Sequence, residues 1–257
     1  MFPPVLLLPK LVALADRAGE VILGHYRDGT EVRAKADASP VTAADEAAEA
    51  VLLAGLRELT PGIPIVAEEA VAAGSVPEIG EGPFWLVDPL DGTREFLSKN
   101  GEFTVNLALV DAGQPLLGGV LAPAIGVAWW GAVGHGSVRR EGGEARAIRV
   151  RARPSAGVVA VASRSHRDAE TDAWLEAEGV RETVAAGSSL KFCLVAEGRA
   201  DVYPRFGPTM EWDTAAGHGV LRAAGGRVVT TDGRPLGYGK PGFKNPAFIA
   251  VGGTTTN

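Results

Sequence analysis

Two short apolar segments of this chain end directly in acidic residues. Residues 63–67 lead into Glu68, and residues 84–87 lead into Asp88, with Asp91 three positions further on. Apolar runs of this length predict buried strands, which would carry these carboxylates at their C-terminal ends. Two acids at the end of a buried strand are costly unless a cation neutralises them. Both strand ends are therefore candidate site positions.

The spacing of apolar residues predicts a mixed fold in two halves. Helical periodicity predicts helices over residues 11–26 and 43–59, the second capped by Thr42. Alternating segments predict hairpins over 104–123 and 127–140, then strands over 147–151 and 158–162, a helix over 168–178, another strand, and helices over 189–196 and up to 224. We expect an α+β first domain, 1–153, built on an antiparallel sheet, and an α/β second domain, 154–257, with a cleft shared between them.

Composition and charge exclude several classes of partner. The chain has 257 residues, 46% of them hydrophobic, and a net charge of −6 with a pI near 5.3. Nucleic-acid binding and attraction to an anionic membrane are therefore not expected. No segment has the ~20 uninterrupted apolar residues of a spanning helix. The single cysteine, Cys193, favours a reducing compartment, and we expect a cytoplasmic protein. A homodimer is one possible assembly.

Residues 85–93, Trp-Leu-Val-Asp-Pro-Leu-Asp-Gly-Thr, carry the clearest chemistry. Asp88 and Asp91 are expected on one tight turn stiffened by Pro89, where two carboxylates suit a magnesium-sized ion. The N–H groups of Gly92 and Thr93 would open a short helix over 94–99, which favours a phosphate. Asp-Pro and Asp-Gly are each common turn dipeptides, so either alone favours a plain turn. Their combination after a buried strand favours a metal and phosphate site.

Four segments together carry a resemblance to a known family. Residues 85–93 resemble the signature of the inositol monophosphatase-like metal-dependent phosphatases, and residues 40–45, 65–69 and 211–216 resemble that family's other motifs in the same order and at similar spacing. The resemblance extends from about residue 11 to residue 250. It implies an α+β fold, a layered α-β-α-β-α sandwich of the inositol monophosphatase and fructose bisphosphatase type.

The resemblance also implies residue roles. Two or three magnesium ions would be bound by Glu68, Asp88, the backbone carbonyl of Leu90, Asp91 and Asp213. Asp45 and Thr93 would orient the attacking water, with no covalent intermediate. Taken alone, Asp45 is better explained as a solvated acid in the first turn of a helix, and Asp213 has the alternative explanation of an acid at a helix N-terminus. The choice of Glu68 over Glu69 depends on the resemblance.

Residues 94–97 and 100–106 resemble the branch that hydrolyses 3'(2'),5'-bisphosphate nucleotides. That branch converts adenosine 3',5'-bisphosphate to AMP and phosphate and can act on the sulfated analogue, which links it to sulfur metabolism. Lys191 and Arg205 would hold the phosphate that is not cleaved, with Ser188 and His166 as hydrogen-bonding groups. The full set of expected substrate contacts is Glu68, Leu90, Asp91, Gly92, Thr93, His166, Ser188, Lys191, Arg205 and Asp213.

Two alternatives stay open at this point. A phosphatase of the same fold could act on an inositol or sugar phosphate, which would be favoured if Lys191 and Arg205 lay too far from the metals to hold a second phosphate. A catalytically idle nucleotide or metal sensor would keep the fold, but it would normally lose a metal ligand or a water-orienting residue. This chain keeps all of them, so binding without turnover is the least favoured of the three.

Overall fold

The computed structural model describes residues 4–34, 40–155, 157–163 and 168–253. Its helices are α1 (Leu8–Asp28), α2 (Ala43–Leu59), α3 (Glu68–Ala72), α4 (Thr93–Leu97), α5 (Ala169–Ala177), α6 (Leu190–Ala196) and α7 (Glu211–Ala223), with 3-10 turns at Pro4–Leu7, Pro123–Ile125 and Pro241–Phe243. Its strands are β1 (Val32–Ala34), β2 (Pro40–Thr42), β3 (Ile65–Ala67), β4 (Phe84–Asp91), β5 (Thr104–Asp111), β6 (Gln114–Ala122), β7 (Val127–Ala132), β8 (Gly136–Glu141), β9 (Glu144–Ile148), β10 (Val159–Ser163), β11 (Glu182–Ala186), β12 (Val202–Arg205), β13 (Arg227–Thr230) and β14 (Phe248–Val251).

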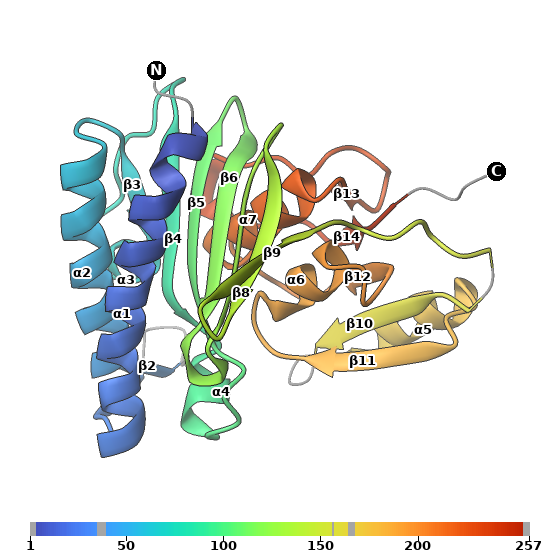
Figure 1. The fold of residues 1–257 in the computed structure, drawn as a ribbon, viewed down its shortest axis with the longest axis horizontal. Coiled ribbons are helices and arrows are strands. Elements are labelled where there is room, and N and C mark those ends of the chain that lie inside the picture. The colour runs from blue at the N-terminus through green and yellow to red at the C-terminus, as the bar shows by residue number, and fades with distance from the viewer. Residues whose placement is uncertain (1–3, 35–39, 156, 164–167, 254–257) are drawn as a thin grey trace.

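These elements form five layers (Figure 1). Helices α1 and α2 cover one face of a seven-stranded sheet, and α7 with α6 covers the other. A five-stranded sheet follows, and α5 packs on its far face. The predicted α-β-α-β-α sandwich is therefore confirmed. None of the helices in the described ranges has the length and hydropathy needed to cross a membrane.

The seven-stranded sheet has the order β3-β4-β5-β6-β7-β8-β9, and all of its pairs are antiparallel except β3 with β4. Both predicted hairpins are present, as β5–β6 and β7–β8. The strand predicted over 147–151 was placed too late in the chain. Gly142 and Gly143 both have positive φ, 57° and 85°, and form a two-residue hairpin turn, so pairing resumes at residue 144 and ends at 148.

The five-stranded sheet has the order β11-β10-β12-β14-β13, parallel around β10 and antiparallel around β14. Helix α7 follows this sheet's β12 in the chain, yet it packs against β5, β6 and β7 of the other sheet. A Cβ on Gly118 of β6 would lie 2.1 Å from the carbonyl oxygen of Ala216, so glycine permits this close contact. The division into domains 1–153 and 154–257 stays a prediction.

Helices α1 and α2 form as the apolar pattern predicts. Helix α1 begins three residues earlier than predicted because proline is tolerated in the first turn, where Pro9 lies. Helix α2 has the predicted bounds. Thr42 accepts a hydrogen bond from Ala44 N–H and completes a capping box with Asp45. Cys193 is buried in α6, as expected of a small packed side chain.

A buried histidine on α7 gives this fold a defined acid sensitivity. His218 is 2% exposed, and its Nδ1 shares a 3.0 Å hydrogen bond with the hydroxyl of Tyr238. Burial, and secondarily the charge of Arg222, lowers the pKa of His218 to about 3. In the unfolded chain His218 binds a proton near pH 6.5. The contribution of His218 to the free energy of unfolding is therefore fully present above pH 6.5 and is lost as the pH falls toward 3.

The His218→Asn variant tests this linkage, because an asparagine amide can take the place of Nδ1. Between pH 7.5 and 5 the wild type should lose about 2 kcal/mol of unfolding free energy through His218, at roughly 1.4 kcal/mol per pH unit below 6.5. Urea unfolding at the two pH values should show that this difference shrinks by about that amount in the variant. Equal pH dependence in both proteins would refute the assignment.

Candidate active site

A cavity of about 600 Å³ lies where the two sheets and α7 meet. Residues from the ends of β4, β10 and β12 and from the first turns of α3, α4, α6 and α7 line it. The lining includes every described residue that was predicted to contact substrate: Glu68, Leu90, Asp91, Gly92, Thr93, Ser188, Lys191, Arg205 and Asp213. His166 lies outside the described residues. The chain thus brings segments more than 100 positions apart into one pocket.

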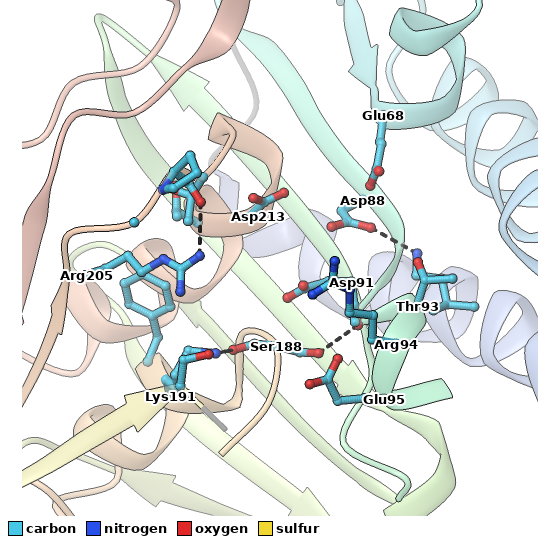
Figure 2. Close-up of a pocket in the computed structure, with 18 of the residues that line it drawn as sticks. Glu68, Asp88, Asp91, Thr93, Arg94, Glu95, Ser188, Lys191, Arg205 and Asp213 are labelled. Carbon is cyan, nitrogen blue, oxygen red and sulfur yellow. Dashed lines mark hydrogen bonds between the residues drawn. The ribbon is translucent and has the colours of Figure 1, made fainter. Parts of the chain in front are cut away.

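Three carboxylates converge on one wall of this pocket (Figure 2). Glu68 begins α3 directly after β3, Asp88 lies on β4, and Asp213 lies in the first turn of α7. Each offers an oxygen within 4.8 Å of the oxygens of the other two. Burial raises the pKa of Asp88 well above its usual value, and the charges of Glu68, Asp91 and Asp213 raise it further. The pKa of Asp213 is also raised, first by burial and then by Asp91 and Glu68.

A β-bulge, rather than the predicted tight turn, brings Asp91 to the same side of the sheet as Asp88. Strand β4 continues to Asp91, but Asp88 pairs with Asn106 and Asp91 with Thr104, so three residues span two on β5. Without the extra residue, positions 88 and 91 would face opposite sides of the sheet. Pro89 fits because a bulge leaves one residue without a ladder hydrogen bond. The prediction of a turn was wrong. Asp88 and Asp91 line the same pocket, but Asp91 is not one of the three carboxylates whose oxygens lie within 4.8 Å of one another.

Asp91 is held by polar residues of β5 that sequence analysis did not single out. Its Oδ2 accepts hydrogen bonds from Asn106 Nδ2 at 3.2 Å and Thr104 Oγ1 at 3.4 Å. Asn106 also donates to Ser189 Oγ at 3.0 Å, and Ser189 donates to the carbonyl of Asp213 at 2.9 Å. Burial raises the pKa of Asp91 to about 6, an effect opposed by the charge of Lys191. A polar Asn106 within an otherwise apolar strand was the available signal.

Asp45 and Thr93, the expected water-orienting pair, are in contact. Thr93 Oγ1 donates to Asp45 Oδ1 at 3.4 Å, and the Thr42 N–H and hydroxyl donate to Asp45 Oδ2 at 2.8 and 2.7 Å. Asp45 is only 2% exposed. The alternative reading of Asp45 as a solvated acid of α2 is therefore wrong, because its carboxylate is buried and directed at the pocket residue Thr93.

Glu68 and Glu69 are adjacent in the chain but make different contacts. Glu68 belongs to the three-carboxylate group, whereas the backbone N–H of Glu69 donates to Glu49 Oε2 at 2.8 Å. Glu49 is a buried carboxylate of α2 that the sequence did not indicate as relevant. Its hydrogen bond connects the first turn of α3 to α2 and so fixes the position at which α3, and with it Glu68, begins.

The turn after Asp91 requires glycine. Gly92 has φ of 90°, and a Cβ there would lie 2.1 Å from Ser188 Oγ. The Ser188 hydroxyl lies 2.8 Å from the Asp91 carbonyl and 2.7 Å from the Glu102 carbonyl, to either of which it can donate. Ser188 itself has φ of 48°. It therefore joins the β4–α4 turn to the segment before α6, and the two walls of the pocket meet there.

Two cations lie across the pocket from the carboxylates (Figure 2). Lys191 is 6% exposed, and its Nζ donates to the Ser188 carbonyl at 2.6 Å and lies 5.4 Å from the centre of the Tyr203 ring. Burial lowers the pKa of Lys191 to about 8, although the charge of Asp91 opposes the shift. Arg205 is 9% exposed and donates from Nη2 to the Pro208 carbonyl at 3.0 Å. Both face the space that a substrate would fill.

The donor set on the carboxylate wall fits a hard divalent cation. All three groups offer oxygen, the type of ligand that magnesium and calcium prefer. The raised pKa values of Asp88 and Asp213 reflect burial and the repulsion of neighbouring carboxylates, which a bound cation would relieve. Glu68, Asp88 and Asp213 therefore form a candidate metal site, and Asp91 lines the same pocket beside them.

Metal binding and carboxylate repulsion predict opposite effects of one substitution on stability. Asp88→Asn removes a buried negative charge but keeps the Oδ1 that accepts the 3.0 Å hydrogen bond from Leu90 N–H. In chelator we expect its thermal midpoint to exceed that of the wild type by a few degrees, on the order of 1 kcal/mol. Excess Mg²⁺ should raise the wild-type midpoint, as expected for a ligand of the native state, and should have little effect on the variant.

Thermal unfolding with and without Mg²⁺ measures both effects. The surface variant Asp232→Asn serves as the control, since Asp232 lies in an exposed turn and pairs with Arg234. An Asp88→Asn protein that is destabilised in chelator, or that still gains as much from Mg²⁺ as the wild type, would contradict the assignment.

Comparison with known proteins agrees with this geometry. Residues 7–251 match the profile of the inositol monophosphatase family, and the chain belongs to that family. It is 50% identical over 247 residues to the 3'(2'),5'-bisphosphate nucleotidase CysQ of Escherichia coli K12, covering 94% of this chain and 98% of that protein.

Solved structures give the same family. The CysQ structure from Bacteroides thetaiotaomicron superposes with a TM-score of 0.80 at 39% identity, over 94% of this chain and 95% of the other. The IMPase of Thermotoga maritima superposes with a TM-score of 0.78 at 27% identity, over 95% of this chain and 91% of the other. The greater identity is thus with CysQ proteins, of which the E. coli relative is named a nucleotidase.

Proposed function

We propose that this chain is a magnesium-dependent 3'(2'),5'-bisphosphate nucleotidase that converts adenosine 3',5'-bisphosphate to AMP and phosphate. The observation that carries the proposal is that three carboxylates and two buried cations lie on opposite walls of one cavity. The carboxylates belong to Glu68, Asp88 and Asp213, and the cations are Lys191 and Arg205. A substrate with two phosphates can meet both walls at once. The 50% identity to a CysQ nucleotidase over nearly the whole chain supports the same substrate class.

The carboxylate wall would hold the metal and the phosphate that is cleaved. Bound magnesium supplies positive charge that polarises the phosphoryl group and makes the attacking water more acidic. Glu68, Asp88 and Asp213 would hold the ion, together with Asp91 and the Leu90 carbonyl. Two or three ions are proposed, as the resemblance implies. The N–H groups of Gly92 and Thr93 would donate hydrogen bonds to the phosphate oxygens.

Asp45 and Thr93 would activate the water. The Thr93 hydroxyl donates to Asp45 Oδ1, so its lone pairs remain available to accept a proton from water. As the water oxygen attacks phosphorus, its proton passes to Thr93 Oγ1 and the proton of Thr93 passes to Asp45. The bond from phosphorus to the 3'-oxygen breaks with its electron pair on that oxygen, which takes a proton from solvent water, and the nucleotide leaves as its alcohol. No bond forms between the protein and phosphorus.

Lys191 and Arg205 would bind the phosphate that stays on the nucleotide. Arg205 can offer two parallel N–H donors to that phosphate, and Lys191 supplies a point charge next to it. Ser188 would act mainly through its backbone, because its hydroxyl lies between two carbonyl oxygens. His166 remains a predicted contact. The single buried Cys193 is consistent with a cytoplasmic protein, which we also propose.

A substrate panel tests the proposal. Purified protein with Mg²⁺ is given adenosine 3',5'-bisphosphate, inositol 1-phosphate and fructose 1,6-bisphosphate at equal concentrations, and released phosphate is measured. We expect the highest kcat/KM for the nucleotide. A preference for inositol or sugar phosphate would keep the metal chemistry and refute the substrate, and no release from any of them would favour a sensor.

A further inference from the structure

The segment between β13 and β14 is bound tightly to the first turn of α7. Glu211 begins α7 and is 0% exposed. Its carboxylate accepts hydrogen bonds from the N–H groups of Gly239 at 2.7 Å and Lys240 at 2.9 Å. The ammonium of Lys240 pairs with the same carboxylate at 2.7 Å. A buried acid is thereby neutralised by a segment nearly 30 residues later in the chain.

Asn245 extends this contact to both sides of Asp213. Its side-chain amide donates to the Met210 carbonyl at 2.8 Å and to Thr214 Oγ1 at 3.0 Å. Its Oδ1 accepts from Lys240 Nζ at 3.2 Å. Met210 and Thr214 lie on either side of Asp213 in the chain. We call Glu211, Lys240 and Asn245 the α7 clamp.

One further hydrogen bond connects the clamp to Asp213, a member of the candidate metal site. The N–H of Met210 donates to Asp213 Oδ2 at 2.8 Å, which orients the carboxylate within the capping box of α7. Asp213 offers an oxygen to the group formed with Glu68 and Asp88. A shift of Met210 would therefore rotate or displace a candidate metal ligand, and ligand orientation strongly affects metal affinity.

The same segment carries backbone strain that the packing must offset. Phe243 is not glycine, yet it has φ of 54°. Its ring packs 6.0 Å from that of Trp212, the residue directly before Asp213. Such a conformation persists only where the surroundings determine it strongly. The clamp contacts on either side of Phe243, at Lys240 and Asn245, supply that constraint.

We propose that Lys240 and Asn245 are positioning residues for the metal site, acting on Asp213 through Glu211, Met210 and Thr214. This inference rests on the proposed metal role of Asp213. Neither residue lines the pocket, so their effect is transmitted rather than direct. A purely structural role for the segment would alter stability without altering the affinity for metal.

Metal affinity is measured directly by titrating the purified protein with Mn²⁺ and following free Mn²⁺ by electron paramagnetic resonance. Lys240→Met and Asn245→Ala should each weaken binding about 10- to 100-fold, the range found when partners of metal ligands are removed. Lys240→Arg should restore most of the affinity, because it keeps the charge beside Glu211. Each variant is measured well below its own thermal midpoint.

Arg151→Met is the matched control. Arg151 pairs at 2.7 Å with Asp201, another acid whose side chain is fully buried and which also accepts a backbone N–H, from Val159 at 2.8 Å. Removing Arg151 therefore also leaves a buried carboxylate without its cation, but at a place outside the pocket. We expect it to lower the thermal midpoint as much as Lys240→Met does, while Mn²⁺ affinity stays within about twofold of the wild type.

Asp213→Asn separates the two levels of the argument. If Asp213→Asn loses Mn²⁺ affinity but both clamp variants bind as the wild type does, the positioning role is refuted and the metal site stands. If Asp213→Asn itself binds as the wild type does, the metal assignment of Asp213 fails, and the inference fails with it. If Lys240→Met and Arg151→Met weakened Mn²⁺ binding equally, the effect would be one of general destabilisation, and this result would also refute the inference.

Discussion

Replacing Asp91 by asparagine should reduce phosphate release from adenosine 3',5'-bisphosphate at least about a thousandfold, equivalent to roughly 4 kcal/mol of transition-state stabilisation. The substitution removes one negative charge from the wall that holds the cation and the phosphoryl group. An asparagine oxygen can still accept the hydrogen bonds that Asn106 and Thr104 give to Asp91. The fold should therefore survive while the charge is lost.

The rate is measured at saturating substrate over a range of Mg²⁺ concentrations, with circular dichroism and thermal unfolding to verify the fold. Asp111→Asn is the matched control. Asp111 is the last residue of β5, the strand that pairs with β4, and it does not line the pocket. Its activity should equal that of the wild type. A loss of less than tenfold in Asp91→Asn would remove Asp91 from the metal wall.

Lys191→Met should lower kcat/KM for adenosine 3',5'-bisphosphate by about 30- to 700-fold while leaving adenosine 3'-monophosphate nearly unaffected. Loss of a buried, charge-assisted contact costs about 2–4 kcal/mol, and 1.4 kcal/mol corresponds to a tenfold change. Methionine keeps the unbranched stem that packs near Tyr203. Adenosine 3'-monophosphate presents the same scissile bond without the second phosphate.

The two substrates and two proteins form a double cycle that isolates the contact between Lys191 and the 5'-phosphate. Arg205→Met should give the same pattern, since both cations lie on the same wall. If Lys191→Met lowered kcat/KM equally for both nucleotides, the residue would act on the reacting phosphate or on the fold. The proposed subsite for the second phosphate would then be wrong.

Asp88 could be predicted from the sequence alone because it ends a strongly apolar segment, whereas the choice of Glu68 over Glu69 and the role of Asp213 depended on the family resemblance. The run from Phe84 to Asp88 identifies β4 and its acid with no structural knowledge. The side of the sheet that Asp91 faces could not be predicted, since it depends on one extra residue against Asn106 and Thr104 of β5. Register of this kind is a property of the strand pair and not of either strand alone.

The α7 clamp had no local signal at all. Lys240 and Asn245 lie in a segment without helix or strand periodicity, and their partners are 29 to 35 positions earlier in the chain. The place of β9 was missed for a smaller reason, because Gly142 and Gly143 were not recognised as a two-residue hairpin turn. The contacts of the clamp are non-local and arise only when the sheets and α7 have packed.

The account is tested most directly by phosphorus-31 NMR of adenosine 3',5'-bisphosphate incubated with the purified protein. With Mg²⁺ we predict that the 3'-phosphate signal is replaced by inorganic phosphate while the 5'-phosphate signal persists as AMP, and that chelator stops the reaction. Loss of the 5'-phosphate in place of the 3'-phosphate, or release that continues unchanged in chelator, would contradict the account.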